Sequence, residues 1–397
     1  MANLRVAGGN REATTLTKRG KFFDYTLLIV VLFLMGFGLV MVYSTSSYSG
    51  LQDAGDSAFY FKKQLKASII GLVGMAAVTL ISYKVWYKCA WVIYLGSVVS
   101  ILLVLTPLGM TLNGARRWIG IGGMSVQPAE IAKLGLIITL AAFTAYSGKN
   151  MKNVRNNLMF IGLGAIVALM ILIITNNLST AIIIVGIAYI MLIIANPKPA
   201  WIVVVTAVGV VAVIAFLVIF FNNVDEASGF GFRFKRLLAW RNPEEYASGV
   251  GYQTLQALYA IGSGGFFGKG LGNSIQKLGF IPEAQNDMIF SVVCEELGLF
   301  GGICLIVLFA ILIWRFIVIA NNAPDLFGSM LVVGVMAHIA IQVILNIAVV
   351  TNTIPNTGIT LPFISYGGTS VLFLMVEMGI VLNVSMQIRV PVPVGKE

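Results

Sequence analysis

The chain has 397 residues, of which 58% are hydrophobic and only 11% are charged, and its mean hydropathy is +0.92. Soluble domains are about 45–50% apolar and about 25% charged, so this chain has too few charges to cover a soluble surface. A cytosolic enzyme, a secreted domain and a disordered chain are therefore excluded. The sequence predicts an integral membrane protein, with room for about ten spanning helices of about 20 residues each.

The charges and cysteines narrow the class further. Lys and Arg number 26 against 16 Asp and Glu, which gives a net charge of +10. The three cysteines all fall in apolar stretches, so the sequence contains no disulfide framework and no spacing typical of metal ligands. A single histidine excludes a histidine-rich metal site.

Runs without charge predict ten transmembrane helices and an all-α, polytopic fold. The first run follows a basic tail and is long enough to span, and no small-residue cleavage motif follows it, so we predict a retained helix and not a signal peptide. Asn176 and Asn177 divide a later apolar stretch, too long for one helix, into two. The predicted spans are residues 25–43, 67–83, 85–105, 128–146, 158–175, 178–195, 201–221, 288–319, 327–350 and 365–387.

Lys and Arg in the tails and short loops predict the orientation. One face holds 14 of them, and the short loops of the other face hold only Lys62, Lys63, Lys66, Arg116 and Arg117. Because cytoplasmic loops carry the excess, both termini are predicted to be cytoplasmic. The predicted organisation is a cytoplasmic tail (1–24), helices one to seven (25–221), a large extracellular loop between helices seven and eight (222–286), helices eight to ten (287–388) and a second cytoplasmic tail (389–397).

Two outer segments differ from ordinary connections. Segment 222–286 is long, and loops of this length in a compact fold are usually functional. We expect short amphipathic helices on the outer membrane surface there. Segment 352–370 has no charge and is apolar and rich in Gly and Pro, so we expect it to re-enter the bundle, where protein covers its backbone. The residues expected to face lipid in the first segment are Phe230, Phe232, Phe234, Leu237, Leu238 and Trp240.

Two charged pairs lie near the predicted outer ends of helices. Glu130 and Lys133 have the i, i+3 spacing that places both side chains on one helix face. They form either a structural ion pair or the floor of an outward-facing cavity. Arg116 and Arg117, followed by Trp118, are either an interfacial anchor or a bidentate phosphate site; two adjacent arginines on the outer side favour phosphate.

The glycine-rich run 262–272 is not a nucleotide-binding loop. A P-loop needs glycine where Ser263 stands and Ser or Thr where Gly270 stands. What remains is backbone that can approach a ligand closely, with Lys269 and Lys277 available to an anion.

Acidic residues near the eighth predicted helix are the remaining candidates. Asp287 lies where the long loop ends and the helix begins, so it is either an N-cap or a carboxylate held at the outer surface. Glu295 and Glu296 follow eight and nine residues later. We expect them to hydrogen-bond neighbouring helices or to titrate, and we expect His338 and Glu377 to form packing pairs.

Together these segments resemble the SEDS family of bacterial cell-wall polymerases, which includes FtsW, RodA and SpoVE. The likeness covers residues 24–389, and four motifs occur in the order typical of the family. Tyr43-Ser44-Thr45-Ser46-Ser47 and Gln285-Asn286 favour the division branch or its sporulation relative. One departure is Ala129, where many members have Ser. The motifs are Arg116-Arg117-Trp118 with Gln127-Pro128-x-Glu130-x-x-Lys133, Gln256-Ala257-Leu258 through Gly265, Pro282-Glu283-Ala284-Gln285-Asn286-Asp287 through Gly298, and Leu361-Pro362-Phe363-Ile364-Ser365-Tyr366-Gly367-Gly368.

The resemblance implies glycosyl transfer from lipid II, an undecaprenyl-linked disaccharide-pentapeptide, on the outer face of the plasma membrane, with inversion and with Asp287 as general base. It implies supporting roles for Glu130, Lys133, Glu295 and Glu296, and a pyrophosphate leaving group stabilised by cationic side chains or by Mg²⁺ or Mn²⁺. The residues it implies for substrate binding are Arg116, Arg117, Trp118, Gln127, Ser263, Lys269, Lys277 and Ser365.

The resemblance also implies partners and a place in the cell. It points to a class B penicillin-binding protein and other division proteins at the septum, and it implies no nucleic acid. Two other functions stay open from the sequence. A lipid II flippase would use ionisable residues through the membrane midplane, and a non-catalytic division scaffold would leave Asp287 as a helix cap.

Overall fold

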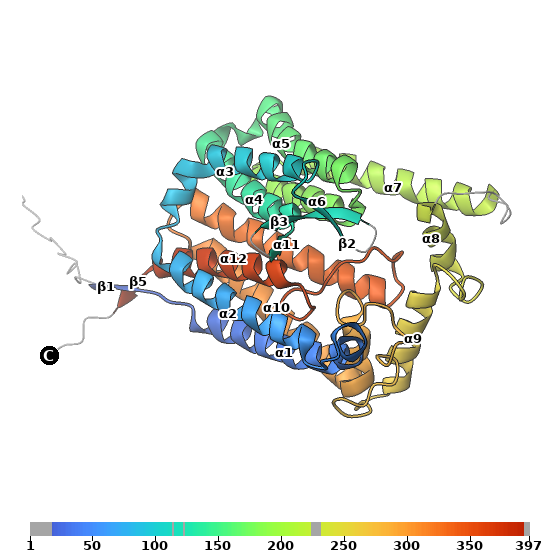
Figure 1. Cartoon of the computed structure of the whole chain (residues 1–397). Coiled ribbons are helices and arrows are strands. Elements are labelled where there is room, and N and C mark those ends of the chain that lie inside the picture. Colours follow the sequence, from blue (N-terminus) through green and yellow to red (C-terminus); the bar gives the residue numbers. More distant parts are fainter. Residues whose placement is uncertain (1–17, 113–114, 122–123, 224–231, 393–397) are drawn as a thin grey trace, which may run out of the picture.

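The computed structural model describes residues 18–112, 115–121, 124–223 and 232–392. Long helices dominate this part of the chain and correspond one to one with the ten predicted spans (Figure 1). Nine are long and apolar enough to cross a membrane within the described residues, and α7 contributes a shorter apolar stretch, Ala200–Gly209. The ten helices are α1 (Tyr25–Ala54), α2 (Phe59–Leu80), α3 (Lys84–Leu103), α4 (Pro128–Ser147), α5 (Val154–Ile174), α6 (Leu178–Ala195), α7 (Ala200–Asn223), α10 (Ile289–Asn322), α11 (Leu326–Val350) and α12 (Gly368–Met386).

The first helix is longer than predicted. Asp24 caps it by accepting a hydrogen bond from the backbone N–H of Leu27, and the same carboxylate pairs with Arg315 of α10 at 2.6 Å. The helix ends at Gly55, whose φ of +67° suits glycine. The serine-rich stretch after the predicted span, 44–47, therefore lies inside α1. Hydropathy missed this extension because Ser and Thr hydroxyls bond to carbonyls one turn earlier, as Thr45 does with Met41.

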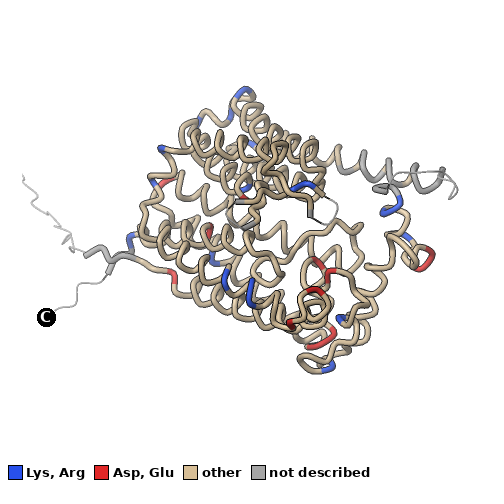
Figure 2. The backbone as a smooth tube through the Cα atoms, in the orientation of Figure 1, with Lys and Arg blue, Asp and Glu red and all other residues tan. Residues whose placement is uncertain are grey.

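Helix α11 lies in the centre of the bundle and packs against α4, α6 and α10. Gly334 allows close approach, because a Cβ there would lie 2.5 Å from Ile137 of α4 and 3.0 Å from Met191 of α6. Helix α2 packs along α12, α3 along α4 and α5 along α6, while α7 projects from the edge of the bundle (Figure 1). Charged residues are few along the helices, and most of the backbone is tan (Figure 2).

Short strands were not predicted from the sequence. The connection between α3 and α4 forms an antiparallel sheet of β2 (Gly109–Leu112), β3 (Ala115–Ile121) and β4 (Met124–Val126). Near the two termini, β1 (Lys18–Lys21) pairs with β5 (Arg389–Val392). The fold is thus helical with two small sheets. The strands were missed because segments of three to seven residues give too short a pattern of alternating hydrophobic residues to recognise.

The outer segment after α7 contains two more helices, α8 (Phe232–Arg241) and α9 (Tyr252–Gly264). Phe230 lies outside the described residues. Trp240 was expected to face lipid, but its indole N–H donates to the carbonyl of Asn352 at 3.0 Å. The end of α8 therefore docks on the connection between α11 and α12, because a membrane-level indole needs a hydrogen-bond acceptor.

The connection between α11 and α12 enters the bundle. Leu361, Phe363 and Ile364 are buried, and Phe363 has a φ of +64°. Its carbonyl lies so close to α1 that a Cβ on Gly38 would be 2.2 Å away. The irregular backbone is covered by protein on several sides, as such backbone must be in a membrane protein.

Candidate functional site

Asp287 lies where three elements meet: the start of α10, the start of α9 and the connection between α11 and α12. Its carboxylate Oδ1 accepts a hydrogen bond from Gln253 Nε2 at 3.3 Å, and its backbone carbonyl accepts one from Asn346 Nδ2 at 2.8 Å. Helix α10 begins at Ile289, its N-cap residue is Met288, and no side chain caps it. The interpretation of Asp287 as the N-cap of α10 is therefore wrong, and capping does not explain the position of its carboxylate.

The surroundings of Asp287 hold it near the point of ionisation at neutral pH. The pKa of its carboxyl is raised to about 7, mainly by burial and in smaller part by the nearby carboxylate of Glu283. The cation of Arg236 and the hydrogen bond from Gln253 act in the opposite direction. A carboxyl with a pKa near the working pH is well matched to general acid or base catalysis.

Two arginines from distant parts of the chain lie close enough to interact electrostatically. Arg236 of α8 donates from Nη1 to the carbonyl of Asn356 at 3.0 Å. Arg117 of β3 donates to the carbonyls of Thr175 and Asn176 at 3.0 and 2.9 Å. Burial lowers the pKa of both guanidiniums, and Arg236 lowers that of Arg117 further. Both stay cationic at neutral pH, and together they form a positive region in which Arg236 acts on the carboxylate of Asp287.

The adjacent arginines of the sequence motif do not share one position. The register of β3 against β2 shifts between Arg116 and Trp118, and the two guanidiniums have different partners: Arg116 donates from Nη2 to the carbonyl of Thr106 at 2.6 Å, away from the contacts of Arg117. Trp118 follows on β3 opposite Met110, and Gln127 immediately precedes α4. The structure thus brings Arg117 toward Arg236, which is the arginine that acts on Asp287, and gives Arg116, Trp118 and Gln127 no contact with that carboxylate in the described residues.

Glu130 and Lys133 form the predicted pair. Their charged atoms are 2.9 Å apart and both side chains are buried. Glu130 Oε2 has no hydrogen-bond partner in the described part of the chain. The burial of Glu130 and Lys133 agrees with a structural ion pair. In the alternative interpretation, as the floor of a cavity, the unpaired Oε2 of Glu130 is the atom that would contact a ligand.

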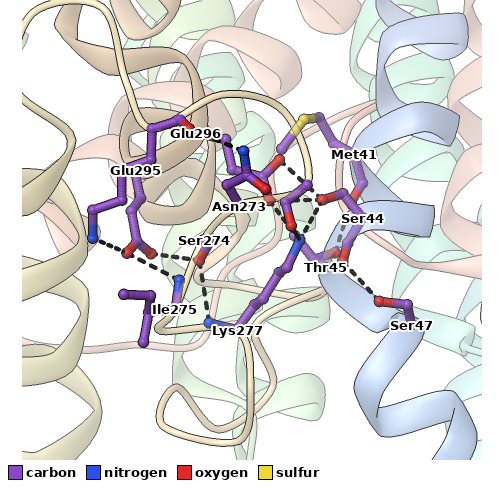
Figure 3. A network of polar contacts seen from close by, with 12 residues as sticks. Met41, Ser44, Thr45, Ser47, Asn273, Ser274, Ile275, Lys277, Glu295 and Glu296 are labelled. Carbon is purple, nitrogen blue, oxygen red and sulfur yellow. Dashed lines mark hydrogen bonds and ion pairs between the residues drawn. The ribbon is translucent and has the colours of Figure 1, made fainter.

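A buried polar network occupies the space between α1, α10 and the segment after α9, and Figure 3 shows how its side chains converge. Glu295 accepts from Lys269 Nζ at 2.7 Å and from the hydroxyls of Ser263 and Ser274. Backbone N–H groups at positions 275 and 276 complete its shell. This carboxylate is therefore fully satisfied, with Ser263 and Lys269 as its partners.

The neighbouring carboxylate has a separate set of partners. Glu296 accepts from Lys277 Nζ at 2.8 Å and from Ser44 Oγ at 2.7 Å (Figure 3). Lys277 also donates to Ser44 Oγ and to the carbonyl of Gly272. Sequence reasoning left Lys269 and Lys277 free for an anion, but both are bound to glutamates, and Lys277 is only 6% exposed. Lys269, Lys277 and Ser263 therefore stabilise the buried glutamates, a role that the sequence alone did not predict.

The glycine-rich segment closes this network through its backbone. Helix α10 is interrupted at Gly298, whose φ is +72°. A Cβ on Gly298 would lie 2.3 Å from the carbonyl of Phe266, and one on Gly268 would lie 2.2 Å from the carbonyl of Glu296. The glycines are thus required for close packing of backbone on backbone.

Ser365 and the remaining buried pair also have protein partners. Ser365 Oγ accepts from the N–H of Leu361 at 2.7 Å, and its carbonyl accepts from Gln64 of α2. His338 Nδ1 lies 2.9 Å from Glu377 Oε2, so these two residues pair as expected. Ser365 therefore holds the turn that precedes α12.

A metal ion has no protein cage in the described residues. No three His, Cys, Asp or Glu side chains there gather closely enough to hold one. Asp287 and Glu283 are the only acidic residues that act on one another at the candidate site in this part of the chain. The donor set of these residues does not fit a resident Mg²⁺ or Mn²⁺.

Sequence reasoning missed three residues of the site: Arg236, Gln253 and Asn356. Each belongs to a segment that was treated as surface or loop. Gln253 lies three residues before the quoted motif that begins at Gln256, and Asn356 lies in the uncharged re-entrant segment. A polar amide in a segment expected to enter the bundle is the signal that could have pointed to Asn356.

Comparison with known proteins gives the family. The profile of the cell cycle proteins FtsW, RodA and SpoVE matches residues 25–390. Stage V sporulation protein E of Bacillus subtilis (strain 168) is 39% identical over 364 residues, covering 91% of this chain and 96% of that protein. A probable peptidoglycan glycosyltransferase FtsW of Trichlorobacter lovleyi is 38% identical over 383 residues, covering 94% and 96%.

Solved structures agree with these relatives. A structure described as "Structural coordination of polymerization and crosslinking by a peptidoglycan synthase complex" matches with a TM-score of 0.74 and 25% identity, covering 91% of this chain and 97% of the other. The rod shape determining protein RodA of Thermus thermophilus matches with a TM-score of 0.63 and 25% identity, covering 92% and 97%.

The fold and the site therefore define a multi-pass membrane protein with an acidic group and two arginines at one end of its helical bundle. The chain belongs to the FtsW/RodA/SpoVE family, as the four sequence motifs predicted. Division and sporulation relatives match almost equally well, at 38% and 39% identity, so identity does not separate the two branches.

Proposed function

We propose that this protein is a peptidoglycan glycosyltransferase that polymerises lipid II on the outer face of the bacterial plasma membrane. The observation that carries the proposal is Asp287, a partly buried carboxyl with a pKa of about 7 beside Arg236, which in turn lies near Arg117. The names of the FtsW relatives, which are probable peptidoglycan glycosyltransferases, support the same activity.

The proposed chemistry transfers a sugar with inversion. The 4-hydroxyl of the acceptor GlcNAc attacks the anomeric carbon of the donor, and Asp287 accepts the hydroxyl proton. The bond from the anomeric carbon to the lipid pyrophosphate breaks, and its electron pair leaves with the pyrophosphate. General-base assistance of this kind contributes about 10²–10⁴-fold to a rate. A single carboxylate without a covalent intermediate fits inversion of the α-linked donor to a β-linked glycan.

The arginines take the charge of the leaving group in this proposal. Pyrophosphate gains negative charge as the glycosidic bond breaks, and fixed cations stabilise such charge most where water is partly excluded. Arg117 and Arg236 are both half-buried and already oriented by backbone carbonyls, so little reorganisation is needed. Arg116, Trp118 and Gln127 remain candidates for contacts to more distant parts of the lipid. A divalent cation, Mg²⁺ or Mn²⁺, would enter with the pyrophosphate.

The partner and location follow from the same proposal. The structural relative is part of a peptidoglycan synthase complex that polymerises and cross-links. We propose a class B penicillin-binding protein as the partner that cross-links the new strands, and the division septum, with other division proteins, as the location. The outer segment 222–286 is the proposed extracellular loop, and both termini are proposed to be cytoplasmic.

The test is polymerisation of purified lipid II by the full chain, with and without the partner transpeptidase. The native protein should make glycan strands, and Asp287→Ala should make none while it keeps its folding and its binding to the partner. A native complex that moves lipid II between leaflets without polymerising it would support the flippase, for which His338 and Glu377 offer a buried ionisable pair. A complex that does neither would support the scaffold.

A further inference from the structure

Two side-chain amides connect Asp287 to the segment between α11 and α12. The backbone N–H of Gly358 donates to Asn356 Oδ1 at 3.1 Å. Asn356 Nδ2 donates to Gln253 Oε1 at 2.9 Å. Gln253 Nε2 then donates to Asp287 Oδ1 at 3.3 Å. Three elements of the fold are thus joined by one directed chain of hydrogen bonds that ends on the candidate base.

The orientation of each amide in this chain is set by its neighbour. A backbone N–H can only donate, so it requires the oxygen of Asn356 and turns the Asn356 NH₂ group toward Gln253. Gln253 must therefore accept this hydrogen bond with its side-chain oxygen, so its NH₂ group points toward Asp287. The second proton of that NH₂ group has its own acceptor, the carbonyl of Pro282 at 3.0 Å. Reversing either amide would place like groups face to face.

We infer that Gln253 is a positioning residue for the transfer reaction: it holds Asp287 Oδ1, and Asn356 fixes the direction of the Gln253 amide. This inference rests on the proposed function. A donor on one carboxylate oxygen favours the ionised form and restricts rotation of the carboxylate. The other oxygen, Oδ2, borders Gly358, where a Cβ would lie 3.6 Å away. A side chain at position 358 would therefore contact Oδ2, and glycine avoids that contact.

The charged groups that act on Asp287 in the described residues are Glu283 and Arg236. Neither lies on the amide chain, although Arg236 donates to the backbone carbonyl of Asn356. Replacing Gln253 with an apolar residue of similar length therefore removes the donor to Asp287, together with the bonds to Pro282 and Asn356, and leaves both charges in place. The effect on the ionisation of Asp287 has one direction, because only a group that stabilises the anion is removed.

The experiment measures kcat and KM for lipid II against pH in the complex with the partner transpeptidase, for native protein, Gln253→Met, Asn356→Leu and the double variant. For Gln253→Met we expect the acid limb of kcat/KM to move to higher pH and KM to stay unchanged. We expect kcat at pH 7 to fall about 3- to 10-fold, which is the loss expected for one hydrogen bond. Asn356→Leu should move the limb in the same direction by less. The double variant should match Gln253→Met, because Asn356 acts through Gln253.

The matched control is Gln52→Met, which removes an exposed amide that bonds only to Tyr48 in the described part of α1. It should leave the pH profile unchanged. An unmoved acid limb in folded Gln253→Met overturns the inference, and so does an additive double variant. If Gln253→Met does not fold, an unmoved limb in Asn356→Leu has the same meaning.

Failure of the inference and failure of the proposed function give different results. Native protein that polymerises, with inactive Asp287→Ala and unaffected Gln253→Met, removes only the positioning role. If the native complex makes no glycan, the proposed function fails. The amide chain is then judged by infrared titration of the Asp287 carboxyl, taken as native minus Asp287→Asn. The pKa must be higher in Gln253→Met than in the native protein, and an equal pKa overturns the inference.

Discussion

Lys277, in the outer segment, and Glu296, in α10, form an ion pair with 2.8 Å between Nζ and Oε1 and with both side chains almost fully buried. Ser44 of α1 bonds to both of them. The pair therefore joins three segments that lie far apart in the sequence. Charges so deeply buried are tolerated only when each has its partner.

Removing one member of this pair should destabilise the protein more than removing both. Lys277→Met leaves Glu296 buried without its cation, and losses of about 3–5 kcal/mol are typical of such changes. Lys277→Met combined with Glu296→Gln should recover part of the loss. Thermal unfolding of the detergent-solubilised protein measures both. Equal unfolding temperatures for the native protein and Lys277→Met would show that the pair is not holding the segment.

The proposed general base predicts a pH profile. Asp287 must be ionised to accept a proton, and its pKa is raised to about 7, mainly by burial. Activity should therefore be low at pH 5.5, rise through about pH 7 and level off above it. The logarithm of kcat/KM plotted against pH in the reconstituted complex measures this limb. A flat profile from pH 5.5 to 8 would remove Asp287 as the base.

The same raised pKa predicts a stability effect of opposite sense to the usual one for an acid. The folded carboxyl binds its proton more tightly than the unfolded one, so its contribution to stability is complete below about pH 4 and is lost as the pH rises through about 7. Asp287→Asn, which cannot ionise, should therefore unfold at a higher temperature than the native protein at pH 8. At pH 4 the difference should be small. A lower unfolding temperature for Asp287→Asn at pH 8 would mean that the ionised carboxylate is needed for the fold.

The sequence predicted the helices well, but it predicted poorly which side chains of different helices and loops contact one another. Runs without charge predicted all ten long helices, because a spanning helix must be apolar over about 20 residues. Asp287 was a candidate because it lies where the long loop ends and the eighth of these helices begins. Gln253 could not be connected with it, since the two meet only when α9 folds back beside α10. The lysines were misjudged because the glutamates that bind them lie 19 and 26 residues away.

The break in α10 predicts a residue-specific requirement for glycine. Gly298 has a φ of +72°, and a Cβ there would lie 2.3 Å from the carbonyl of Phe266 and 2.4 Å from the nitrogen of Gly268. Gly298→Ala should therefore destabilise the protein by more than the roughly 1–2 kcal/mol that left-handed backbone alone costs. Gly96→Ala is the matched control, because a Cβ at Gly96 in α3 meets nothing within 4 Å. It should leave unfolding temperature unchanged or raise it.

The two arginines of the sequence motif should differ in their effect on substrate binding. Arg117 lies in the positive region with Arg236, whereas Arg116 is turned to the carbonyl of Thr106. A hydrogen bond between charged groups is worth about 1.5–3 kcal/mol, so Arg117→Gln and Arg236→Gln should each lower kcat/KM for lipid II by about 10- to 100-fold. Arg116→Gln should have a clearly smaller effect. Purified lipid II and the partner complex give the comparison under one set of conditions. A larger loss in Arg116→Gln than in Arg117→Gln would move the pyrophosphate to the other face of β3.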